Sequence, residues 1–579
     1  MKTNIDNIIR SQQICNILIF LGVLFFQSLI AKDVNLQALE PGKRENNIYH
    51  VWIYFNDKNI KNIQNENSYL SQLRKSMEPR TIKRRKKVKS VNKLVDTYDI
   101  PVSMSYINYV IESGVKIRTI SKWMNAVSVS GIISQIELIT QYSFVKKIEP
   151  VLSGKRPKIN VNPPLYKIQS DSSFYGDSYD QLNQINVIQL HEAGYSGEDV
   201  RILVLDSGFS LDHEVFESLN IIAAYDFVDQ DSVVSNEEEK DPPNQHNHGT
   251  SVLSVLAGFK AETLIGSAYG AEFLLGKTED VSLEMPIEED NYVIALEWGE
   301  SLGADILSSS IGYIDWYSQN DLDGSTAVIT QAVNIAIELG MVVVTAVGNS
   351  GATGIVAPAD AFNVISCGAV DDTGVISTFS SRGPTADGRT KPEVCAQGNG
   401  TFSATASSAT SYGSGMGTSL AAPLISGACA LLLEAHPDWT PSQIRNAILN
   451  TADQSDTPDN TYGWGIIDAV AALNYDQTNL PSDSTSFISN GYPNPSDKRV
   501  TFALKYLPES AIEISIIDVK GISIFGRNVT LLQNENLIHL NLKNYPSGIY
   551  FVVFNFNHNV FITRKICHLK GYENPCTEE

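Results

Sequence analysis

The sequence predicts an α/β fold, a parallel sheet with helices on both faces, for the middle of this 579-residue chain. Short runs rich in apolar residues, such as VRILVLDSG (Val200–Gly208) and MVVVTAVGNSG (Met341–Gly351), are predicted as strands and alternate there with segments of helical spacing such as STAVITQAVNIAIELG (Ser325–Gly340). Strands that are apolar along their whole length are typical of parallel sheets covered by helices on both sides. We therefore predict a three-layer parallel-sheet domain.

Polar residues follow several of these apolar runs directly. Asp206-Ser207-Gly208, Ser308-Ser309-Ser310 and Gly348-Asn349-Ser350 each stand where a predicted strand ends. In parallel sheets, functional groups collect outside the carboxyl ends of the strands. These three segments are therefore expected at one functional edge of the sheet.

Smaller units flank the parallel-sheet domain. The N-terminal one is predicted as a small α+β unit, with a strand at IYHVWIYF (Ile48–Phe55), a basic helix over 74–94 and helical spacing over 132–148. The C-terminal one is rich in strand-like runs, such as GIYFVVFNF (Gly548–Phe556), and predicts a small antiparallel β-sandwich. The predicted boundaries are 1–31 for a signal peptide, 32–160 for the N-terminal unit, 175–475 for the parallel-sheet domain, 476–486 for a linker and 487–579 for the C-terminal unit.

The charge of the chain is acidic but uneven. The net charge of −22 argues against a nucleic-acid-binding protein. Between Lys43 and Lys158, however, basic residues outnumber acidic ones by about two to one, with a dense run at RTIKRRKKVK (Arg80–Lys89). This run predicts either a solvated helix face or a segment that complements an acidic partner in the same chain.

The N-terminus has the features of an export signal. Lys2 and Arg10 precede the apolar stretch ICNILIFLGVLFF (Ile14–Phe26), and Ala31 offers a small residue before a charge. The apolar stretch is short for a membrane span, and no later segment is expected to be long and apolar enough to span a bilayer. We therefore predict an exported protein without a transmembrane span in its mature form.

The cysteines do not form a dense disulfide framework. Removal of the signal would take Cys15 and leave an odd number of thiols. A disulfide between the near neighbours Cys567 and Cys576 and two free thiols both remain open. The remaining cysteines are Cys367, Cys395, Cys429, Cys567 and Cys576.

Four polar residues at predicted strand or helix ends could together carry out acyl transfer. That chemistry needs a nucleophile, a base, a carboxylate that orients the base and a donor for the oxyanion. Asp206 and Asn349 follow apolar strands, while His248 and Ser419 stand at helix starts. Each has a plainer interpretation in isolation, as a turn residue or a helix cap, and His246 competes with His248.

The stretch GSGMGTSLAAPLISGACALLL (Gly413–Leu433) carries the candidate nucleophile. Ala421 stands where a Gly-x-Ser-x-Gly elbow has its second glycine, which disfavours an α/β-hydrolase. Pro423 fits only near the beginning of a helix. A serine at a helix start has backbone N–H groups and the positive end of the helix dipole nearby, and both stabilise an oxyanion.

Five segments in this order resemble the consecutive signatures of the subtilisin-like serine peptidases: VLDSGFSLDHEVF, HNHGTSVLSVLAG, SSSIGY, VVVTAVGNSG and GMGTSLAAPLISG. The resemblance covers about half of the chain, roughly 177–473. It implies a secreted or surface-attached serine endopeptidase that works through an acyl-enzyme. By this resemblance, Asp206 orients the base, His248 is the general base and Ser419 attacks the scissile carbonyl. Asn349 and the backbone N–H of Ser419 donate to the oxyanion.

The same resemblance implies the walls of the pocket for the first substrate residue. Val347 and Tyr313 stand where smaller residues are usual, and we expect them to narrow this pocket. The residues matched to the two walls are Ser310, Ile311 and Gly312 on one side and Ala346, Val347 and Gly348 on the other.

The flanking units carry weaker resemblances. The unit over 45–150 resembles the inhibitory pro-segments of secreted subtilisin-like enzymes, which implies a zymogen whose own pro-segment docks electrostatically as inhibitor and chaperone. The C-terminal unit, with YPNPSDKRVTFAL and LNLKNYPSGIYFVVF, resembles the type A sorting domain of type IX secretion. This implies the type IX machinery as a partner, besides protein or peptide substrates. It also implies a location outside a Gram-negative cell, extracellular or on its outer surface.

No cofactor is implied for catalysis. The acidic loop DQDSVVSNEEEKD (Asp229–Asp241) predicts either a structural calcium site or a solvated loop, and a His246–His248 metal pair lacks a completing ligand at the usual spacing. Two other functions remain open. One is a catalytically silent surface binding or adhesion protein on the same fold, and the other is an enzyme that acts mainly on its own chain.

Overall fold

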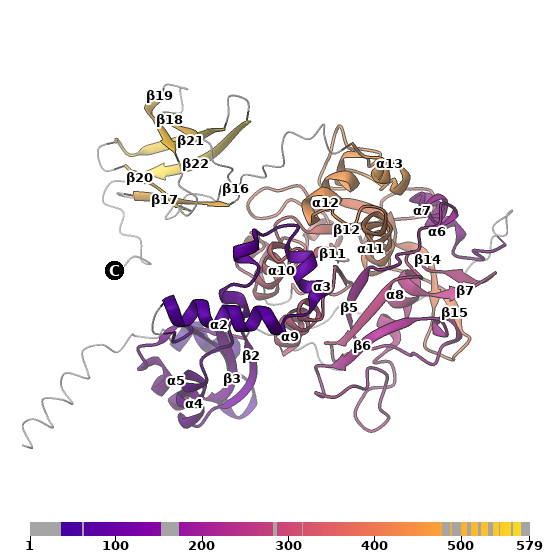
Figure 1. Cartoon of the computed structure of the whole chain (residues 1–579), viewed down its shortest axis with the longest axis horizontal. Coiled ribbons are helices and arrows are strands. Elements are labelled where there is room, and N and C mark those ends of the chain that lie inside the picture. Colours follow the sequence, from indigo (N-terminus) through magenta and orange to yellow (C-terminus); the bar gives the residue numbers. More distant parts are fainter. Residues whose placement is uncertain are drawn as a thin grey trace, which may run out of the picture. The chain divides into compact units, whose positions relative to one another are not determined.

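The computed structural model divides into two compact units, Met1–Tyr475 and Asp476–Glu579, which are described separately (Figure 1). The structure describes residues 36–60, 63–151, 173–281, 287–314, 317–476, 487–488, 499–505, 511–518, 523–530, 537–542, 545–556 and 560–568. The predicted signal peptide and most of the two predicted linkers lie outside these ranges.

A seven-stranded sheet forms the centre of the first unit, in the order β13-β12-β11-β10-β5-β9-β6, and every neighbouring pair is parallel. Ile202 and Val204 of β5 pack in one hydrophobic cluster, while Leu203 and Leu205 pack in the other. Both faces are therefore buried, as predicted. The strands are β5 (Arg201–Asp206), β6 (Asn220–Asp226), β9 (Glu272–Lys277), β10 (Ile306–Ser309), β11 (Val342–Ala346), β12 (Ile365–Val370) and β13 (Val394–Gln397).

Helices cover both faces of this sheet, which confirms the three-layer prediction (Figure 1). Helices α8 (Asn247–Ala257) and α11 (Thr418–Ala435) pack on one face, and α9 (Ile287–Ser301) and α10 (Val328–Glu338) on the other. The remaining elements of this domain are α6 (Tyr179–Gln184), α7 (Val187–Glu192), η5 (Glu214–Phe216), β7 (Phe259–Lys260), β8 (Leu264–Ile265), η6 (Gln319–Asp321), η7 (Gly351–Thr353), β14 (Asn399–Ala404), β15 (Tyr412–Met416), α12 (Pro441–Asn450) and α13 (Ala469–Leu473).

Helix α11 is apolar because it is a core helix. With 18 residues, the helix is long and apolar enough to cross a membrane, but 89% of these residues are buried inside the domain. The expectation that no segment after the signal has this length and apolarity is therefore wrong for α11. Its burial against the sheet accounts for its composition.

The N-terminal unit is a four-stranded antiparallel sheet, in the order β2-β3-β1-β4, with helices packed on it. Val51, Ile53 and Phe55 of β1 share a core with Ile107 of α4 and Ile136 of α5, which confirms the predicted α+β unit. Its elements are η1 (Leu36–Gly42), η2 (Glu45–Asn47), β1 (Ile48–Phe55), α2 (Ile63–Ser76), α3 (Pro79–Arg85), η3 (Val91–Lys93), η4 (Thr97–Asp99), α4 (Met104–Glu112), β2 (Lys116–Ser121), β3 (Ala126–Ile132), α5 (Ile133–Thr140) and β4 (Val145–Pro150).

Two predicted helices of this unit have different extents in the structure. Helix α5 ends at Thr140, and the rest of the predicted segment 132–148 leads into strand β4, which covers the free edge of β1. The basic stretch 74–94 is not one helix either. Pro79 has no amide hydrogen to donate to the preceding turn, so it ends α2 and begins α3.

The sheet of the N-terminal unit lies against α9 of the parallel-sheet domain. The Ser121 hydroxyl donates to Glu297 at 2.6 Å, and the Ser128 hydroxyl donates to Asp290 at 2.6 Å. Arg118 also pairs with Asp290 at 3.1 Å. Because these two carboxyls are buried here, their pKa values are raised. An acidic side of α9 is therefore covered by the basic N-terminal unit.

The second unit is a β-sandwich, as predicted. Its two antiparallel sheets have the orders β16-β17-β20 and β19-β18-β21-β22, and Phe502 of one meets Phe554 of the other at 5.1 Å between ring centroids. Whether Cys567 pairs with Cys576 stays open, because Cys576 lies outside the described residues. The strands are β16 (Phe487–Ile488), β17 (Arg499–Lys505), β18 (Ala511–Asp518), β19 (Ser523–Thr530), β20 (Leu537–Asn541), β21 (Gly548–Phe556) and β22 (Val560–His568).

Candidate active site

Asp206 and His248 meet at the C-terminal edge of the parallel sheet. Asp206 is the last residue of β5 and is fully buried, while His248 lies in the first turn of α8 with its ring partly exposed. His248 Nδ1 lies 2.7 Å from Asp206 Oδ1, and the Ser207 N–H donates to the same oxygen at 2.7 Å. With Nδ1–H held by the carboxylate, Nε2 is left as the acceptor of the neutral ring.

Gly249 allows α8 to approach the end of β5 this closely. A Cβ at position 249 would lie 2.2 Å from Gly208 O and 3.0 Å from Asp206 Oδ1. Any side chain here would therefore push the helix, and His248 with it, away from the carboxylate. The glycine that follows the histidine in the sequence thus has a direct geometric role.

His246, the competing histidine, makes different contacts. Its Nδ1 accepts a hydrogen bond from the Asn236 N–H at 3.1 Å, and its carbonyl oxygen accepts one from the Thr250 hydroxyl at 2.6 Å. Burial lowers the pKa of the His246 ring. The structure therefore pairs His248, and not His246, with the buried aspartate.

The acidic loop Asp229–Asp241 has cationic partners within the protein. Lys240 contacts Asp231 at 3.0 Å, and the buried Lys277 contacts Asp241 at 2.7 Å. Carboxylates of the loop therefore already have ammonium partners, and the choice between a calcium site and a solvated loop stays a prediction. Within the described ranges, no group of three or more His, Cys, Asp or Glu residues is arranged to hold a metal ion.

Ser419 and Asn349 face the same small space beside the start of α11. Ser419 is the second residue of α11 and is 5% exposed. A Cβ built at Gly417 would lie 2.8 Å from Ser419 Oγ and 3.5 Å from Asn349 Nδ2. The hydroxyl and the amide nitrogen thus border one space, which stays open because residue 417 is a glycine.

Thr418 fixes the orientation of the Asn349 amide. Its backbone N–H and its hydroxyl both donate to Asn349 Oδ1, at 2.9 and 3.0 Å, and its hydroxyl accepts from the Gly348 N–H at 3.3 Å. With the amide oxygen held, Nδ2 is presented toward the space beside Ser419. The sequence analysis missed Thr418, although its place directly before Ser419 is a signal that could have identified it.

The two pairs lie on the same side of the sheet, because α8 and α11 pack against each other. The Ser310 hydroxyl donates to Ser419 O at 2.7 Å and so joins the start of α11 to the end of β10. Between the described side chains of Ser419 and His248 no hydrogen bond is formed. Such contacts are often long in substrate-free enzymes and tighten when substrate binds.

Val356 fills the space between the two predicted pocket walls. A Cβ at Gly312 would lie 2.4 Å from Val356 Cγ2, and one at Gly348 would lie 2.8 Å from Cγ1. Val356 is buried but belongs to neither large hydrophobic cluster of the domain. The sequence analysis missed this residue, because no local pattern marks it and only the fold brings it between the strand ends.

The side chains of Val347 and Tyr313 pack elsewhere. Both are buried in the hydrophobic cluster on the α9 and α10 face of the sheet. The Tyr313 hydroxyl donates to the buried Glu279, and burial raises the Tyr313 pKa well above its usual value. The prediction that these two side chains narrow the pocket is therefore wrong, because both side chains pack in the hydrophobic core.

Three sequence families match separate parts of the chain. The subtilase family matches residues 197–465, and the peptidase S8 propeptide domain of Bacteroidota matches residues 50–163. A secretion system C-terminal sorting domain matches residues 490–568. The three matches follow one another in the same order as the predicted N-terminal unit, parallel-sheet domain and C-terminal unit. The exact domain boundaries stay predictions.

Individual relatives are similar over half of the chain or more. Subtilisin E of Bacillus subtilis (strain 168) is 30% identical over 342 residues, which are 57% of this chain and 82% of that protein. Subtilisin Savinase of Lederbergia lenta is 30% identical over 292 residues, which are 50% of this chain and 97% of that protein. Fervidolysin of Fervidobacterium pennivorans, a keratinolytic enzyme related to subtilisin, has a similar fold. Its TM-score is 0.55 at 17% identity, covering 89% of this chain and 88% of that one.

Proposed function

The chain belongs to the subtilase family, and from this premise we propose that Asp206, His248 and Ser419 are the catalytic triad of this secreted serine endopeptidase. The observation that carries the proposal is the 2.7 Å hydrogen bond between the buried Asp206 and His248 at the strand edge next to Ser419. Ser419 Oγ attacks the scissile carbonyl and His248 Nε2 takes its proton. Asp206 holds the ring and stabilises the imidazolium that forms.

Asn349 stabilises the oxyanion in this mechanism. Its Nδ2 and the backbone N–H of Ser419 at the start of α11 donate to the negative oxygen of the tetrahedral intermediate. The protonated His248 then gives its proton to the leaving amine, and an acyl-enzyme remains on Ser419. Water, deprotonated by His248, hydrolyses the acyl-enzyme and restores the serine. No step requires a cofactor.

The first substrate residue lies between the segments Ser310–Gly312 and Ala346–Gly348 in our proposal. Because Val356 already lies between these walls, the pocket has room for a small side chain such as alanine or glycine and excludes phenylalanine. The support is the contact of the two Val356 methyl groups with the glycine of each wall. The pocket proposal depends on the triad being correctly placed.

The test of this function is the hydrolysis of unrelated denatured protein. The full-length chain, once processed, is expected to degrade denatured casein, and the Ser419→Ala chain is expected to leave casein intact. Cleavage of its own chain without cleavage of casein would favour the self-processing alternative. Equal casein degradation by both chains would reject Ser419 as the nucleophile.

The flanking domains direct the secretion of the enzyme and keep it inactive before processing. The sorting domain at 490–568 and the propeptide domain at 50–163 indicate secretion from a Bacteroidota cell. We propose that the type IX machinery delivers the protein to the extracellular space or to the outer cell surface. The pro-segment acts as an intramolecular inhibitor until it is removed, and its Arg118, Ser121 and Ser128 contact the acidic side of α9.

A further inference from the structure

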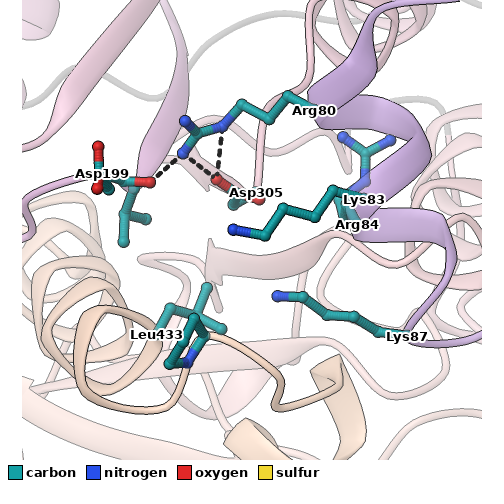
Figure 2. A pocket seen from close by; sticks show the side chains of 9 residues that line it. Arg80, Lys83, Arg84, Lys87, Asp199, Asp305 and Leu433 are labelled. Carbon is teal, nitrogen blue, oxygen red and sulfur yellow. Dashed lines mark hydrogen bonds and ion pairs between the residues drawn. The ribbon is translucent and has the colours of Figure 1, made fainter.

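Helix α3 of the pro-segment contacts the parallel-sheet domain far from the candidate active site. Arg80 pairs with Asp305 at 2.7 Å and donates to Asp199 O (Figure 2). Asp305 directly precedes β10, and Asp199 lies two residues before the start of β5. These contacts are at the N-terminal edge of the sheet, whereas Asp206 ends β5 at the opposite edge. The six residues of β5 separate the two edges by roughly 20 Å.

Two adjacent arginines of α3 converge on one buried carboxylate. Arg85 donates to the Glu300 carboxylate through Nε at 2.9 Å and Nη2 at 3.0 Å, and Arg84 Nη2 donates to the same group. The Glu300 side chain is 1% exposed, and both arginine side chains are equally buried. Glu300 ends the acidic side of α9, three residues after Glu297.

Arg84 also caps the C-terminal end of α10 and reaches the turn that follows α9. Its Nε donates to Leu339 O at 3.2 Å, directly after α10, and its Nη1 donates to Ala304 O, three residues after the end of α9. The last carbonyls of a helix have no partner within it, so Arg84 supplies one for Leu339 O. Gly340 leaves the room for α3, since a Cβ there would lie 3.2 Å from Arg84 O.

Arg85 uses all of its donors at once. Besides Glu300, it binds Asp99 through Nη1 at 2.7 Å and Nη2 at 2.8 Å, and Nη1 donates to Leu94 O at 2.9 Å. Arginine has five N–H donors in a planar fork, which lysine cannot reproduce with one ammonium group. The site is thus built for two arginines in succession and not for positive charge in general.

We propose that the Glu300 carboxylate and the carbonyl oxygens of Ala304 and Leu339 form an arginine socket, a docking site for the Arg84–Arg85 pair of α3 that holds the pro-segment independently of the active site. The proposal rests on the inhibitory role of the pro-segment given above. It adds which contacts give the pro-segment its affinity for the parallel-sheet domain. A pro-segment fastened at the N-terminal edge of the sheet stays bound when the chain between the pro-segment and the parallel-sheet domain is cut, and it leaves faster when the arginine pair is withdrawn.

The test uses the full chain with Ser419→Ala, a C-terminal tag and a site for a sequence-specific protease inserted within residues 153–171. After cutting and immobilisation on the tag, the pro-segment that stays on the resin is measured over time in 0.15 M salt. The Arg84→Gln/Arg85→Gln chain is compared with a matched control, Lys75→Gln/Lys86→Gln, which removes the same charge from exposed positions of the same basic stretch. None of these chains needs catalysis, so the test is separate from that of the triad.

We expect the unsubstituted chain and the lysine control to keep the cut pro-segment, and the arginine variant to release it at least about 100-fold faster, as for loss of buried charge pairs. Arg84→Lys/Arg85→Lys, which keeps the charge, should release it at least about tenfold faster. Glu300→Gln, which alters only the socket, should also accelerate release. The Glu300→Gln chain keeps the test interpretable if the arginine variant does not fold. Thermal unfolding of the uncut chains shows whether each variant is folded.

Immediate release of the pro-segment from the unsubstituted chain would overturn the proposal. Equal release rates for the arginine variants, Glu300→Gln and the lysine control would overturn it as well.

Discussion

At the scale of single residues, the start of α11 serves structure and chemistry together. Thr418 ties the turn to Asn349 through two hydrogen bonds, and Gly417 keeps open the space that Ser419 and Asn349 share. A serine that could be read as a simple helix cap is therefore placed beside an amide donor whose orientation is fixed. The same local order that stabilises the turn also prepares the site for an oxyanion.

Replacement of Asn349 by alanine should reduce the rate of the chemical step. The side chain is proposed to donate to the oxyanion only as negative charge develops, so kcat should fall by roughly 10²–10³ with little change in KM. Steady-state kinetics on a peptide substrate measure both constants. An unchanged kcat, or a loss confined to KM, would remove Asn349 from the oxyanion site.

Replacement of Val356 by glycine should widen the first pocket. Removing its two methyl groups frees the space between Gly312 and Gly348, so the ratio of kcat/KM for phenylalanine over alanine in the first position should rise at least about tenfold. Val347→Ala is the matched control, because its side chain lies in the core and not between the walls. If Val347→Ala changes the ratio and Val356→Gly does not, the pocket is misassigned.

At the scale of elements, the prediction from sequence succeeded where patterns were long and failed where short signals competed. The strand predicted over 200–208, which is β5 (Arg201–Asp206) in the structure, and helix α11 were predictable from their apolar runs. The basic stretch 74–94 was predicted as one helix, but Pro79 divides it. The end of the segment 132–148 has helical spacing, yet it leads into strand β4, because the open edge of β1 offers hydrogen bonds that a local pattern does not show.

Helix α7 should make the domain sensitive to acid through His191. Burial lowers the pKa of this ring to about 4, and its Nε2 contacts Ser267 O at 3.2 Å, so the folded state keeps it neutral. The unfolded chain takes a proton below its usual pKa near 6.5 and the folded one does not until about 4. The free energy of unfolding therefore falls as the pH drops through this window, by on the order of 3 kcal/mol.

His191→Phe keeps an aromatic ring beside Tyr175 and removes the titrating group. In the Ser419→Ala background, which prevents self-digestion, denaturant unfolding of both chains at pH 7 and pH 4 gives the comparison. The variant should lose less stability between these pH values than its parent. An identical loss in both chains would show that His191 is not the titrating group.

At the scale of the whole molecule, the sequence predicted the order of parts and the four residues proposed for catalysis, because each part has a long or specific pattern. It did not predict Val356, Thr418 or Glu300. These residues act through contacts between segments distant in sequence, such as Val356 with Gly312 or Glu300 with Arg84. Of the two interpretations left open for the basic run, the structure shows the acidic partner in the same chain, and only the fold shows that it includes one buried carboxylate of α9.

The central claim, that Ser419 is an activated nucleophile, is tested most directly by covalent labelling. The full-length chain is produced and allowed to mature, and a fluorophosphonate probe is then added to the mature protein. The labelled peptide is identified by mass spectrometry. We expect one adduct, on Ser419, which is absent in Ser419→Ala and strongly reduced in His248→Ala because the base is missing. An adduct on another residue, or labelling of Ser419→Ala to the same extent as the parent, would contradict the account.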